Sequence, residues 1–140
     1  MFSQRSARPA SAYRQVGVET SVAQATPHNL IDMLFDGLLL SLRSARACLQ
    51  RGDIKGKCQH IVTAVRILEE GLQCGLDLQQ GGGLAANLQS LYGYCVIRLT
   101  QANARNDDAA LAEVQQLIEP VAGSWKMIGA EMAVPQLMAA

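Results

Sequence analysis

The chain has 140 residues, of which 49% are hydrophobic and 17% are charged. This length and composition predict one domain with a buried core, and the abundance of Ala, Leu and Gln with few Pro favours helices over sheets. Twelve basic and twelve acidic side chains cancel to no net charge. A nucleic-acid partner is therefore not expected, because such binders carry a basic surface.

Neither a secretory signal nor a membrane span is predicted. Arg5 and Arg8 lie near the start without the apolar run of a signal peptide, and no stretch approaches the ~18 apolar residues that a spanning helix needs. We therefore expect a cytoplasmic protein without membrane insertion. The four cysteines are widely spaced and are expected to be reduced thiols that pack as small hydrophobes. They are Cys48, Cys58, Cys74 and Cys95.

Residues 1–25 are small and polar and are predicted to form a mobile arm. Tyr13, Val16 and Val18 give this arm a sparse apolar series, in which the alternation of Val16 and Val18 suits an extended segment. We expect the arm to be partly docked on the folded domain. The alternative is a disordered arm whose apolar residues are incidental.

Residues 26–49 predict the first helix. Thr26 can cap the first N–H groups, and Pro27 suits the first turn because its missing N–H is not needed there. Met33 and Leu40 lie nearly opposite the apolar face and suggest a second contact surface. The residues of the apolar face are Ile31, Leu34, Phe35, Leu38, Leu42, Ala45 and Leu49.

Three further helices follow, at about residues 54–76, 84–104 and 108–129. Gly52 and Asp53 suit the first turn, residues 77–83 predict a flexible loop around three glycines, and Asn106 and Asp107 suit the last turn. Pro120 predicts a kink in the fourth helix, and residues 131–140 are expected to fray. Four amphipathic helices with short connections predict an all-α fold, an antiparallel up-down-up-down four-helix bundle over residues 26–130.

The polar residues do not converge on a catalytic or metal site. His28 and His60 lie on different predicted helices with no paired nucleophile, and Asp32 and Asp36 map to the solvent side of the first helix. Carboxylate-bridged metal bundles need Glu-x-x-His repeats, which the sequence lacks. We expect no enzyme, no cofactor and no metal.

Apolar residues on the outer sides of the helices remain to be explained. They can belong to a broader core, to a homodimer face or to a groove for an amphipathic partner segment, and the pattern alone does not separate these uses. The residues are Met33, Leu40, Ile67, Cys74, Leu78, Tyr94 and Ile97.

Several motifs, in order and spacing, resemble the flagellar export chaperone family FliS. They are AYRQV at 12–16, PHNLIDMLFDG at 27–37, NLQSLYGY at 87–94, RLTQAN at 98–103 with Asn106-Asp107, and Trp125-Lys126. The resemblance implies a helical bundle that wraps the disordered C-terminal segment of flagellin around its outside. It also implies that the client is kept from polymerising and competent for the type III export apparatus.

The resemblance and the apolar surface together give a hypothesis for the site. Tyr13, Val16 and Val18 would shield a groove lined by Ile67, Cys74, Tyr94 and Ile97, and flagellin would displace them. Leu78, Met33 and Leu40 are expected to add contacts to the arm or the client. The alternative is a structural homo-oligomeric helical protein without a flagellin client, and a homodimer in the absence of client would use the same outer residues.

Overall fold

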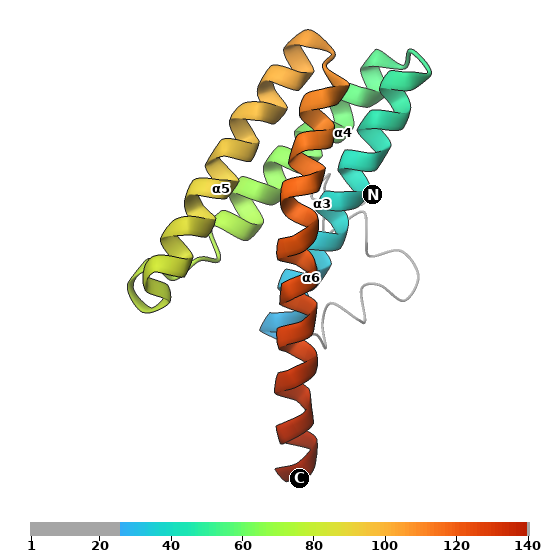
Figure 1. The fold of residues 1–140 in the computed structure, drawn as a ribbon. Coiled ribbons are helices and arrows are strands. Elements are labelled where there is room, and N and C mark those ends of the chain that lie inside the picture. Colours follow the sequence, from blue (N-terminus) through green and yellow to red (C-terminus); the bar gives the residue numbers. More distant parts are fainter. Residues whose placement is uncertain (1–25, 140) are drawn as a thin grey trace, which may run out of the picture.

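The computed structural model describes residues 26–139, which form four long helical segments packed together (Figure 1). Helix α3 spans Pro27–Gln50, α4 spans Ile54–Arg66 and continues as the π-helical segment η1 at Ile67–Gln73, α5 spans Leu78–Arg105, and α6 spans Asp108–Ala139. Successive arms run in opposite directions, α3 packs against α4 and α6, and α5 packs against α4, η1 and α6. The predicted all-α antiparallel bundle is confirmed. The predicted arm with Tyr13, Val16 and Val18 lies outside the described residues.

Two helix caps and two turns form where the sequence predicts them. The Thr26 hydroxyl accepts a hydrogen bond from the Asn29 N–H at 3.1 Å, and the Asp53 carboxylate accepts one from the Gly56 N–H at 2.9 Å. Gly52 has φ 79° and Asn106 has φ 52°, so both adopt the left-handed conformation that ends a helix. Local sequence therefore fixes four helix boundaries, which are the two ends of α3, the start of α4 and the end of α5.

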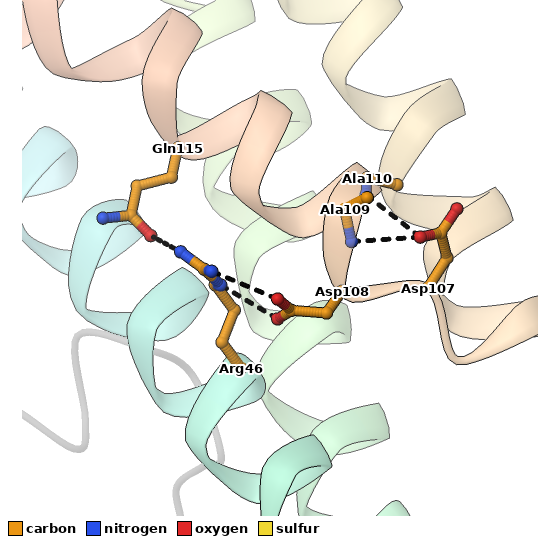
Figure 2. A network of polar contacts seen from close by, with 6 residues as sticks. All are labelled: Arg46, Asp107, Asp108, Ala109, Ala110 and Gln115. Atoms are coloured by element: carbon orange, nitrogen blue, oxygen red, sulfur yellow. Dashed lines mark hydrogen bonds and ion pairs between the residues drawn. The ribbon is translucent and has the colours of Figure 1, made fainter.

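The start of α6 is tied to α3 by a polar network. Arg46 donates from Nε and Nη2 to the two carboxylate oxygens of Asp108, at 2.9 and 3.1 Å, and from Nη1 to Gln115 at 3.2 Å (Figure 2). Beside it, the Asp107 carboxylate accepts the N–H groups of Ala109 and Ala110 and caps α6. A forked guanidinium–carboxylate contact has a fixed geometry, so it sets where α6 begins relative to α3.

The predicted apolar stripes meet in one core. In α3 the predicted face is buried as expected, with Ile31, Leu34 and Leu49 partly exposed at its margins. The fully buried side chains include Leu38, Leu42, Ile61, Leu68, Leu99, Leu111, Val114 and Ile118.

Three predictions about the helices need correction. The second helix is not uniformly α-helical, since η1 replaces its last turns, and there the wider π turn leaves Ile67 and Leu68 both buried. Gly71 permits the close approach of η1 to α3, because a Cβ there would lie 3.0 Å from Leu34. The exposed outer position that the pattern assigned to Ile67 is therefore wrong.

The loop predicted over residues 77–83 is mostly helical. Helix α5 already begins at Leu78, and only Gly82 departs from helical geometry, with φ 55° and ψ −133°. Such a backbone conformation is accessible to glycine at low cost. The glycine run therefore makes a sharp break within one helix instead of a long loop.

Helix α6 is longer than predicted. It continues through Pro120 and past Gly129 to Ala139, so residues 131–139 are helical where fraying was expected. A proline removes one backbone hydrogen bond of the helix, and the hydrogen bonds of the turns on either side keep the helix continuous. Figure 1 shows the end of α6 extending beyond the other helices.

Candidate functional site

The contact between α5 and α6 is anchored by one carboxylate. Glu113 of α6 accepts a hydrogen bond from the Tyr94 hydroxyl at 2.5 Å and from the Arg98 Nε at 2.7 Å. The hydrogen bond from Tyr94, followed by that from Arg98, lowers the pKa of the Glu113 carboxyl, and the pKa of the Tyr94 hydroxyl is raised by the same contact. The three side chains define which side of each helix faces the other.

The helical repeat extends these facing sides away from the turn at Asn106. On α5, Leu91 lies two turns before Arg98 and Leu84 two turns earlier still. On α6, Leu117 and Val121 lie one and two turns beyond Glu113, and Ile128 lies about four turns beyond it. The facing sides are therefore apolar along their length. We call this surface the α5–α6 strip: Leu84, Leu88, Leu91, Leu117, Val121 and Ile128.

The strip becomes exposed with distance from the turn. Leu88, Leu91, Leu117 and Val121 are partly buried and pack against the core. In contrast, Leu84 is 68% exposed and Ile128 is 44% exposed. In an antiparallel pair that stayed in contact, these outer members would cover one another. Figure 1 shows why they do not, since α5 and α6 diverge as they leave their shared turn.

A second set of contacts holds the later part of α6 against α3. The Trp125 ring stacks on His28, with 4.4 Å between centroids, and its Nε1 donates to the His28 carbonyl oxygen at 3.0 Å. Lys126 binds the two oxygens of Asp32 at 2.8 and 2.9 Å, and Asp36 at 3.3 Å. These contacts direct α6 along α3 and leave the side toward α5 uncovered.

Lys126 pairs with the two aspartates that the sequence assigned to a solvated face. Asp36 is exposed and Asp32 is partly exposed, and both bind Lys126 at the surface. Within residues 26–139, no group of three or more His, Cys, Asp or Glu residues is placed to hold a metal ion. Nor does any helix in that range combine the length and hydropathy needed to cross a bilayer.

The residues predicted to line the groove fall in separate places. Tyr94 and Ile97 are exposed on α5, at 43% and 57%. Cys74 and Leu78 are also exposed, but they flank the turn that precedes Gly82. About 18 Å of helix separates Gly82 from Tyr94, so the two pairs do not form one compact site.

The remaining candidates divide between core and surface. Ile67 is only 4% exposed and belongs to the core, so it does not join the exposed residues. Leu40 is 57% exposed and Met33 is partly buried. These two lie seven residues apart on one face of α3, and Asp32 and Arg43, which pair with α6, lie on another. Met33 and Leu40 are therefore remote from the α5–α6 strip.

The α5–α6 strip could not be predicted from the sequence, because periodicity gives its residues the pattern of a core face. Leu88, Leu91, Leu117, Val121 and Ile128 all have core periodicity, and periodicity cannot show that two helices diverge. One signal was available in the composition of α5. Between Leu78 and Ile97 the sequence has no acidic, basic or histidine residue, which is unusual for a surface helix.

Comparison with known proteins gives a result that agrees with the motifs in the sequence. The sequence model of the family described as "Flagellar protein FliS" matches residues 9–132. The "Flagellar secretion chaperone FliS" of Salmonella typhimurium is 47% identical over 84% of this chain and 87% of its own length. The protein of the same name from Escherichia coli is 42% identical over 86% of this chain and 88% of its own. The "Flagellar secretion chaperone FliSB" of Pseudomonas aeruginosa is 42% identical over 81% of this chain and 89% of its own length. The chain belongs to the FliS family of flagellar proteins.

Proposed function

We propose that this protein is a cytoplasmic flagellar secretion chaperone that binds the disordered C-terminal segment of flagellin, chiefly on the α5–α6 strip. The relatives are flagellar secretion chaperones by name. The observation that carries the proposal is the pair of diverging helices, whose facing apolar side chains Leu84 and Ile128 are 68% and 44% exposed.

An amphipathic helix suits this surface physically. Its apolar face would cover Leu84, Leu91 and Ile128, and burial of apolar area contributes about 25 cal/mol per Å². A disordered segment must be ordered on binding, which costs about 2–5 kcal/mol of the gross interaction energy. The complex is therefore specific yet releasable, and handover to the export apparatus requires no nucleotide hydrolysis by the chaperone itself.

Calorimetry against flagellin tests the proposal. Flagellin from the same bacterium should bind one chaperone, and flagellin lacking its last ~40 residues, a length estimated from an extended segment able to wrap a bundle about 30 Å long, should not. Equal binding by both forms would refute the proposal. Sedimentation of the mixture should show a heterodimer, whereas a homodimer that ignores flagellin would support a structural homo-oligomeric protein instead.

The location of the site is tested by a matched pair of variants. Ile128→Asp places a charge on the strip and should weaken flagellin binding about tenfold or more, which is about 1.4 kcal/mol. Ile54→Asp is the control, because Ile54 has nearly the same exposure, 43% against 44%, and lies at the start of α4. A loss of affinity in the control but not in Ile128→Asp would show that flagellin binds outside the strip.

The role of the arm is a separate part of the proposal. Tyr13, Val16 and Val18 cover part of the client surface, including Tyr94 and Ile97, until flagellin displaces them. Deletion of residues 1–18 should leave the fold intact, increase the solvent exposure of Tyr94 and change the affinity for flagellin. Unchanged affinity together with unchanged exposure of Tyr94 would refute the covering role.

A further inference from the structure

The polar side chains that border the α5–α6 strip are amides and hydroxyls. Asn87 lies one turn from both Leu84 and Leu91 and is exposed, as is Ser90, which lies one turn from Asn87. Acidic, basic and histidine residues are absent from the sequence between Leu78 and Ile97. The α5 side of the strip therefore has an apolar centre and an uncharged border.

Among residues 26–129, the charged groups nearest to the strip are already paired. Arg98 binds Glu113 at the end near the turn, and Glu113 also accepts from Tyr94. On α6, Lys126 binds Asp32 and Asp36, and Glu119 lies 3.8 Å from Arg43. All of these pairs except Arg98–Glu113 face α3 and not α5. Along the part of the strip whose side chains the structure describes, from Leu84 to Ile128, a charged partner side chain would meet no unpaired opposite charge and would lose hydration on binding.

We infer that the α5–α6 strip recognises an uncharged amphipathic helix, with aliphatic residues on one face bordered by Asn, Gln, Ser or Thr, and that its affinity does not depend on ionic strength. The inference rests on the proposed function and specifies the chemistry of the client segment. The spacing of Leu84, Leu88 and Leu91 matches about two helical turns of a partner with apolar residues at a similar spacing. Amide and hydroxyl groups of the partner would then meet Asn87 and Ser90.

The first test is the salt dependence of binding by the full chain and the C-terminal ~40 residues of flagellin from the same bacterium. Raising NaCl from about 0.1 M to about 1 M shortens the Debye length from about 10 Å to about 3 Å and would weaken charge-based attraction. The dissociation constant should rise by less than about threefold, and a larger rise would overturn the inference.

The second test places either charge on the border of the strip. Asn87→Asp and Asn87→Lys should both leave binding unchanged or weaker, because an uncharged partner offers neither charge a counterion. Tighter binding by about threefold or more in either variant would reveal a charged partner face and overturn the inference. Gln59→Asp and Gln59→Lys are the controls, because Gln59 is exposed on α4 and lies outside the α5–α6 strip.

Different results would refute the chaperone function and the uncharged partner. Absence of binding between the wild-type chain and the flagellin segment would refute the proposed function itself. Binding that is strongly weakened by salt, or strengthened by one charge at position 87, would leave the chaperone function standing and refute only the uncharged partner. Circular dichroism of each variant confirms that the helical fold is retained.

Discussion

The Trp125 indole lies parallel to the His28 imidazole, with 4.4 Å between ring centroids and 10° between planes, and donates a hydrogen bond to the carbonyl oxygen of His28. The two residues are 97 positions apart in the sequence, in the first turn of α3 and just past the middle of α6. Their contact fixes the direction of α6 beyond the turn with α5. It is thus the structural reason that the α5–α6 strip stays open.

Replacing His28 with Ala should weaken this contact without removing any core residue. The free energy of unfolding should fall by about 1 kcal/mol, the size of a stacked aromatic pair. Urea unfolding can be followed by the fluorescence of Trp125, which is the only tryptophan in the sequence. His60→Ala on α4 is the control and should leave the emission spectrum of the folded protein unchanged. An unaltered spectrum in His28→Ala would contradict the stacking.

Two glycines of α6 should respond to alanine in opposite ways. A Cβ at Gly129 would overlap the His28 ring, whereas a Cβ at Gly123 meets no atom within 4 Å. Gly123→Ala should raise the free energy of unfolding by about 0.5–1 kcal/mol through helix propensity. Gly129→Ala should lower it by about 1 kcal/mol or more because the histidine must move. Thermal unfolding compares them directly, and stabilisation by both would show that His28 can move freely.

Lys57 should be far more important to stability than an ordinary lysine. It is 1% exposed, and its ammonium donates to the Asn103 carbonyl oxygen at 2.8 Å and to the Asn106 side chain at 2.5 Å. Lys57→Met leaves both acceptors unpaired at the end of α5 and should cost about 2 kcal/mol or more. The exposed Lys55 provides the control Lys55→Met, which should change stability little. Similar midpoints of urea unfolding for the two variants would contradict the assigned role.

Stability should fall in alkaline solution. Burial raises the pKa of the Cys95 thiol from 9.0 to about 11 and that of the Tyr92 hydroxyl from 10.0 to about 12. Because both folded-state pKa values lie above the unfolded ones, the stabilisation is complete below pH 9.0 and is lost as the pH rises through the folded values. Each group contributes a slope of up to about 1.4 kcal/mol per pH unit between its two pKa values.

Urea unfolding at a series of pH values measures this loss. Cys95→Ala should lower stability at neutral pH by creating a small cavity. It should also flatten the profile between pH 9.0 and pH 10.0, the pKa at which Tyr92 ionises in the unfolded chain. A profile as steep as that of the wild type would show that another group is responsible.

The sequence by itself determined the local structure and the family. Thr26 and Asp53 cap their helices through side chains that reach an N–H three residues away, and Leu38 and Leu42 lie on a face that only helical periodicity defines. These features depend on neighbours within a turn or two, so spacing alone predicts them. The motifs that indicated the FliS family are likewise strings of sequence.

Tertiary structure decided what the same residues contribute to a surface. Ile67 entered the core because η1 widens against α3, and Lys126 bound Asp32 and Asp36 from far along the chain. Leu84 and Ile128 have the periodicity of core residues, but they stay exposed because the contact of Trp125 with His28 directs α6 along α3 and not along α5. A periodic pattern shows which side of a helix is apolar, and only the packing of distant segments decides whether that side is covered.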